Sequence, residues 1–123
     1  MKLNFKQLIL SASILYLFAN CTNDSVSDLI DATPIPENVT YNQNVKAIMT
    51  NNCTSCHGAI PSNGAPMPLI NLEDVKDAIL NRDLINRITR ENGDGLLMPE
   101  GGPKLLQNKI DAIIQWQLDG FQE

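Results

Sequence analysis

The sequence is poor in histidine, cysteine, aromatic residues and positive charge. One histidine and three cysteines exclude a disulfide-rich scaffold. Nine basic residues stand against fourteen acidic ones, an acidic balance that excludes an extended phosphate-binding surface, so we expect no nucleic acid partner. One tryptophan, two tyrosines and three phenylalanines leave few large rings for the core of a 123-residue chain, which would therefore gain stability from an added apolar body. The length allows a single domain.

The N-terminal segment has the pattern of an export signal. Lys2 and Lys6 precede an almost wholly apolar run over residues 8–19. This run is shorter than the roughly twenty residues that a membrane-spanning helix needs, and it lacks the amphipathic period of a packed helix. A positive start followed by a short apolar stretch is typical of a secretory signal, with a buried N-terminal helix as the alternative.

The apolar run ends in Phe18-Ala19-Asn20-Cys21, which resembles a bacterial lipoprotein signal. The resemblance implies that residues 1–20 are removed, that Cys21 is lipidated, and that the protein is exported and anchored to a bacterial membrane facing the periplasm. The alternative is an unlipidated cysteine after ordinary processing. Residues 21–40 contain Pro34 and Pro36 and show little periodicity, so we expect a flexible tether between the membrane and a domain over 41–123.

The rest of the chain has helical periodicity and no alternating strand pattern. Apolar residues recur at helical spacing in four segments: 41–52, 72–79, 83–90 and 105–118. Asn71 is a good N-cap for the second segment, and Gly120 is placed to end the last one in a left-handed conformation. The sequence predicts an all-α domain with long loops over 53–70 and 91–104, and loops of that length need something to order them.

The first long loop begins with a CxxCH motif made of Cys53, Cys56 and His57. This motif is the attachment signature of c-type haem. Two cysteines on one helical turn present both sulfurs to the two vinyl groups of a porphyrin, and the adjacent imidazole lies beneath the iron. A zinc site would need about four ligands, and the only other cysteine or histidine is Cys21. A thioredoxin-like redox pair would need a βαβ context, and a plain Cys53–Cys56 disulfide is the remaining alternative.

With one histidine in the chain, a second axial ligand has to be a methionine. Met49 lies on the helical face expected to pack, and Met67 follows His57 so closely that little chain is left to cross a haem. Met98 lies in a loop rich in glycine and proline, which can approach a flat face closely. Met98 is the favoured ligand. One alternative is Met67. The other is that Met98 is an ordinary loop residue that does not bind the iron, which would then be five-coordinate.

From about residue 41 to 121 the sequence resembles small class I cytochromes c, in particular the monohaem domains of bacterial lipoproteins. The shared order is a helix, CxxCH, one or two short helices, a Met-Pro-x-Gly-Gly loop over 98–102, and a C-terminal helix bearing Trp116. The resemblance implies a small fold of about four short helices wrapped around one covalent haem. It also implies that the terminal helices cross, with Val45, Ile48 and Met49 against Ile110, Ile113 and Ile114.

The resemblance assigns a role to each residue of the site. Cys53 and Cys56 form thioethers, His57 is the proximal iron ligand and Met98 the distal one. A proline carbonyl orients the imidazole in this family, and Pro66 and Pro68 are the candidates here. Four basic residues could meet the haem propionates or be ordinary surface charge: Arg82, Arg87, Arg90 and Lys104.

Haem with both axial positions filled favours electron transfer over catalysis, so we expect a carrier and not an enzyme. The expected function is a membrane-tethered monohaem cytochrome c that passes single electrons between periplasmic or membrane redox proteins. Two alternatives come from other classes. One is a five-coordinate haem module for gas binding or signalling; the other is a non-haem lipoprotein interaction domain with a Cys53–Cys56 disulfide.

Overall fold

The computed structural model describes residues 36–123, and the signal segment, Cys21 and most of the expected tether lie outside this range. The described residues form helices and no strand: η2 (Tyr41–Val45), α3 (Lys46–Asn52), α4 (Leu72–Asn81), α5 (Leu84–Thr89) and α6 (Gln107–Leu118). The all-α prediction is confirmed for this part of the chain, and all four expected helical segments are present. No helix within it is long and apolar enough to cross a membrane.

The first predicted helix is built from η2 and α3, which follow each other without a break. The Thr40 side chain accepts a hydrogen bond from the backbone N–H of Gln43 at 3.2 Å and so caps its start. Val39 is fully buried in the core. Val39, two residues before the predicted start of the domain, is therefore part of the core, although it lies in the segment expected to be a tether.

Local sequence signals fix the ends of α4 and α6. Asn71 caps α4, as predicted, by accepting from the N–H of Asp74 at 2.9 Å. The helix α6 begins at Gln107 and not near 105, because the extended Leu106 precedes it and offers no side-chain cap. It ends as predicted at Gly120, whose φ of +79° is left-handed. The N–H of Gly120 donates to the carbonyl of Gln117, and that of Phe121 to the carbonyl of Trp116, the paired bonds of a Schellman motif.

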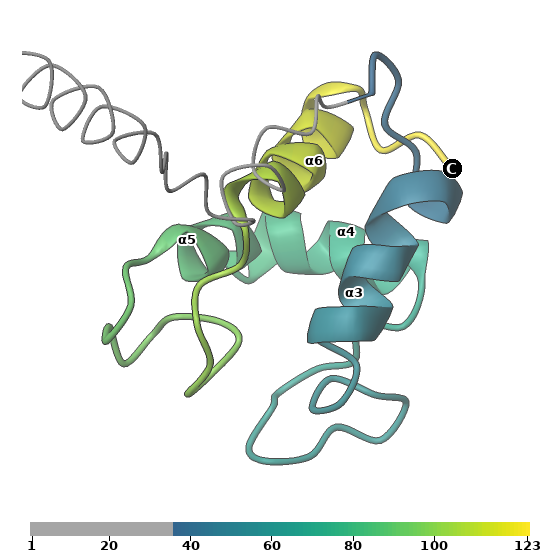
Figure 1. Ribbon diagram of the computed structural model, residues 1–123. Coiled ribbons are helices and arrows are strands. Elements are labelled where there is room, and N and C mark those ends of the chain that lie inside the picture. Colours follow the sequence, from purple (N-terminus) through teal and green to yellow (C-terminus); the bar gives the residue numbers. More distant parts are fainter. Residues whose placement is uncertain (1–35) are drawn as a thin grey trace, which may run out of the picture.

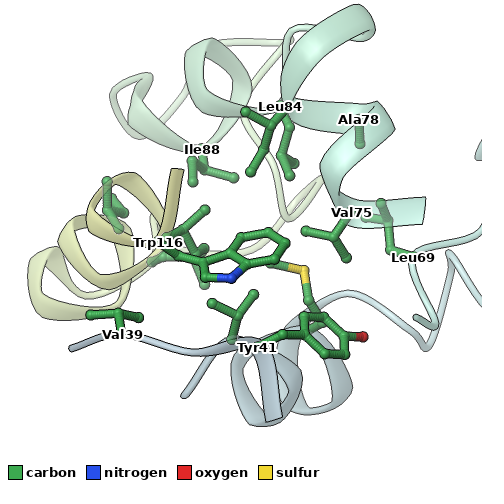
Figure 2. Close-up of a cluster of buried hydrophobic side chains, with 14 residues drawn as sticks. Val39, Tyr41, Leu69, Val75, Ala78, Leu84, Ile88 and Trp116 are labelled. Carbon is green, nitrogen blue, oxygen red and sulfur yellow. The ribbon is translucent and has the colours of Figure 1, made fainter. Parts of the chain in front are cut away.

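The core is organised around Trp116 of α6, which is fully buried (Figure 2). Leu84 and Ile88 of α5 lie on one side of the indole and Tyr41 on the other. The Trp116 and Tyr41 rings are 5.7 Å apart, and Nε1 of Trp116 donates to the carbonyl of Gln122 at 2.7 Å. The core also contains the residues through which the terminal helices were expected to meet, namely Val45, Met49, Ile110 and Ile113, with Ile48 and Ile114 partly buried against them.

The two long loops lie on the same side of the helices (Figure 1). One joins α3 to α4 and carries the CxxCH motif, and the other joins α5 to α6 and carries Met98. The C-terminal segment returns to the first helix, where the N–H of Tyr41 donates to the carbonyl of Gln122 at 2.9 Å. The C-terminal segment thus ties the last helix to the first, and both loops extend from the same side of the helices.

Candidate functional site

A single cavity lies between the two loops and contains every residue of the predicted site within the described part of the chain. Cys53, Cys56, His57 and Met98 all line it. Its volume is about 470 Å³, which lies within the range of cofactor and small-molecule pockets. Residues separated by a long stretch of chain are therefore brought to one place by the helical scaffold.

The CxxCH segment is a tight turn continuous with the end of α3. The N–H of Cys53 donates to the carbonyl of Met49 at 2.8 Å, and the N–H of His57 donates to the carbonyl of Cys53 at 2.9 Å. A further bond from the N–H of Cys56 to the same Cys53 carbonyl, at 3.1 Å, tightens the turn. This turn directs both cysteines and the histidine to the same cavity. Cys53 and Cys56 are free thiols, not joined in a disulfide.

Two features of its surroundings shift the pKa of the Cys53 thiol in opposite directions. Burial raises the pKa of the Cys53 thiol to about 11, while the charge of Lys109 partly lowers it. Lys109 belongs to α6 and lies 3.4 Å from Oδ1 of Asn52, next to Cys53 in the chain. The thiol is therefore neutral at physiological pH and belongs to the apolar wall of the cavity.

His57 is the one buried polar residue among the described residues, with 9% of its surface exposed. Its Nδ1 lies 2.8 Å from the carbonyl oxygen of Met67. A carbonyl can only accept, so Nδ1 carries the hydrogen in this bond, and in the neutral imidazole this leaves Nε2 with the lone pair that a metal would need. Such a bond is the usual means of fixing the ring of a ligating histidine.

The acceptor for His57 differs from the one the resemblance implied. We expected the carbonyl of Pro66 or Pro68, and the structure uses that of Met67, which lies between them. The two prolines restrict the backbone on both sides of Met67 and so help to fix its carbonyl. The N–H of Leu69 also donates to the carbonyl of His57 at 2.9 Å, which ties this part of the loop to the histidine a second time.

Met98 reaches the cavity from the other loop. Its N–H donates to the carbonyl of Arg87 in α5 at 3.1 Å, and its neighbour Leu97 is buried, with 4% of its surface exposed. Met67 also lines the cavity, so both candidate methionines are present there. They differ in attachment, because Met67 belongs to the same loop as His57 whereas Met98 comes from the loop after α5.

The four basic residues separate into two groups. Arg82 and Arg87 line the cavity, whereas Arg90 and Lys104 form ion pairs with Asp94 and Glu91 in the Met98 loop. Arg82 also pairs with an aspartate on α4. Of the four, only Arg82 and Arg87 are therefore placed to meet carboxylate groups of a molecule bound in the cavity, and Arg87 has no ion pair among the described residues.

Sequence analysis alone missed several residues of the cavity wall: Asn52, Leu69, Leu84, Ile88 and Glu100. Leu84 and Ile88 carry a usable signal, because they stand one turn apart on α5 and form part of its apolar face. Glu100 gives no such signal, since an acidic residue in an exposed loop is usually solvated.

The residues present fit a covalent haem. Two thiols, a histidine with Nε2 available and a methionine sulfur share one cavity with apolar walls and two guanidinium groups. Within residues 36–123, no three His, Cys, Asp or Glu side chains are grouped so that they could hold a bare metal ion. Comparisons of the chain with protein-family models, with curated proteins and with solved structures gave no match.

Proposed function

We propose that this protein is a membrane-tethered monohaem c-type cytochrome that passes single electrons between redox proteins on the periplasmic side of a bacterial membrane. The observation that carries the proposal is the convergence of Cys53, Cys56, His57 and Met98 on one cavity. Bound haem would supply a one-electron change at its iron. The chain's own residues would hold the cofactor through Cys53 and Cys56 and fill its two axial positions with His57 and Met98.

The shape of the site suits electron transfer better than catalysis. The cavity wall contains exposed residues, including Ser55, Asn63 and Gly64, so a redox partner can approach the cofactor from solvent. The His57 ring is held by the Met67 carbonyl and the Met98 backbone by the Arg87 carbonyl, and both acceptors are backbone groups that remain when neighbouring side chains are exchanged. If both residues bound the iron of the cofactor, they would leave no position there for a substrate.

The test is covalent attachment of haem in protein exported from a host that matures c-type cytochromes. The wild-type chain should keep one haem after denaturation, measured by mass spectrometry, because thioether bonds survive unfolding. Replacing both cysteines (Cys53→Ala with Cys56→Ala) should abolish retention. A wild-type chain without haem would refute the proposal and favour the non-haem interaction domain.

A further inference from the structure

The backbone of the Met98 loop is organised around Asp94. The N–H of Asp94 donates to the carbonyl of Glu91 at 3.1 Å, and the carbonyl of Asp94 accepts from the N–H of Leu97 at 3.0 Å. These two bonds close successive turns. The second turn ends at Leu97, directly before Met98, so the chain enters Met98 from a turn that begins at Asp94.

The carboxylate of Asp94 holds the same loop from its side chain. Oδ1 accepts from the N–H of Leu96 at 2.8 Å, and Oδ2 accepts from Nη1 of Arg90 at 2.8 Å. The Arg90 guanidinium is itself held, because its Nε donates to Oδ1 of Asn86 in α5 at 2.9 Å. Both carboxylate oxygens and both backbone polar groups of Asp94 are therefore bonded within the loop or to the end of α5.

Together with the bond from the N–H of Met98 to α5, these bonds connect Met98 to the helix by two routes. Met98 is joined to α5 directly, through its N–H and the Arg87 carbonyl, and a second time through Leu97, Asp94 and Arg90. Arg87 and Arg90 stand one turn apart at the end of the same helix. Displacing Met98 from the cavity would stretch both connections, whereas without the Asp94 carboxylate the second connection would lose its links to Arg90 and to the N–H of Leu96.

We propose that Asp94, acting with Arg90, is the positioning residue that keeps the Met98 sulfur on the haem iron. The inference rests on the proposed function, since it concerns the Met98 ligand of that same site. Asp94 does not line the cavity, so it would act on the ligand through the loop. Its bonds would set the fraction of molecules in which the loop has moved and the Met98 sulfur has left the iron. A competing ligand binds in proportion to that fraction.

The experiment measures the affinity of the oxidised holoprotein for added imidazole, which must displace Met98 to bind iron. Asp94→Ala removes two hydrogen bonds to a charged group, and we expect imidazole to bind about tenfold more tightly. Arg90→Gln removes the ion pair with Asp94 and the bond to Asn86 but leaves the Asp94 carboxylate bonded to the N–H of Leu96, and an increase in imidazole affinity of about threefold is expected. The matched control is Asp111→Asn, which removes the charge of a carboxylate that is bonded to Gln107 on α6, away from the Met98 loop, and it should retain wild-type affinity.

Amide exchange of Leu97 and Met98 gives a second readout that needs no added ligand. Both amides should exchange faster in Asp94→Ala, while those of the α6 core should not change. Wild-type imidazole affinity in Asp94→Ala, or an equal change in Asp111→Asn, would overturn the inference alone. A wild-type protein with haem but no methionine ligand would overturn both the inference and the assignment of Met98.

Discussion

At the scale of single residues, the two methionines in the cavity have different roles. Met67 contributes a backbone carbonyl that orients His57, and any side chain at that position can supply it. Met98 lines the same cavity from a loop attached to α5, and its sulfur is the proposed ligand. The sequence contained both candidates, but only the structure shows that the carbonyl of Met67 bonds to His57.

A pair of substitutions separates these roles. Met98→Leu should abolish the far-red absorption band of methionine-ligated ferric haem, because leucine has no sulfur to bind iron. Met67→Leu is the matched control and should keep the band, since its carbonyl still accepts from His57. Visible spectra of the two oxidised proteins test this, and loss of the band in Met67→Leu alone would reverse the assignment.

At the scale of elements, the N-cap of α4 has a measurable effect. Asn71→Ala removes the bond to the N–H of Asp74 and should lower the free energy of unfolding by about 1 kcal/mol. Asn51→Ala, at an exposed position within α3, is the control and should leave stability unchanged or raise it slightly. Urea unfolding of both proteins in the same haem state measures the difference, and an equal loss in both would contradict the capping role.

The sensitivity of the fold to acid also arises at the scale of elements, because the charged forms of two exposed carboxylates are stabilised in the folded state. Hydrogen bonds from Asn81 and Arg82 lower the pKa of Asp77, and those from the Leu96 N–H and Arg90 lower that of Asp94. In the folded state the pKa values of both carboxyls lie below the ordinary 3.8. Their contribution to the free energy of unfolding is therefore present above that pH and is lost as the pH falls through the pKa values of the folded state.

The expected consequence is a melting temperature that falls as the pH drops below about 4. Asp77→Asn should melt lower than wild type at pH 7 and lose less on acidification, with a modest effect because the pair is exposed. Melting curves at pH 7 and pH 3 check both parts. An equal loss in wild type and Asp77→Asn would show that this carboxylate plays no part in acid sensitivity.

The sequence predicted helices well and loop geometry poorly, for a physical reason. Helix limits follow from local signals, such as the side-chain cap at Asn71 and the left-handed Gly120. The acceptor for His57 depends on how the loop over 58–71 folds back, which neighbouring residues do not specify. The same holds for Asp94, whose four bonds are set by the path of an irregular loop. The CxxCH motif can be recognised in the sequence, whereas the contacts that hold it in place cannot.

At the scale of the whole molecule, the burial of Val39 shortens the predicted tether, because this residue packs in the core. The membrane anchor itself remains a prediction from the resemblance at Cys21. Wild-type protein from a bacterial host should partition into the detergent phase, and Cys21→Ala should not carry lipid. Phase partition followed by mass spectrometry of the N-terminal peptide tests this, and an unlipidated wild-type peptide would contradict it.

The visible spectrum of the exported wild-type protein, oxidised and reduced, tests the central claim most directly. The account predicts a sharp low-spin c-type spectrum on reduction and a weak far-red band on oxidation, from iron held by His57 and Met98. A high-spin spectrum would contradict it and indicate an open-site haem module for gas binding or signalling. A colourless protein would contradict the haem assignment of Cys53, Cys56 and His57 altogether.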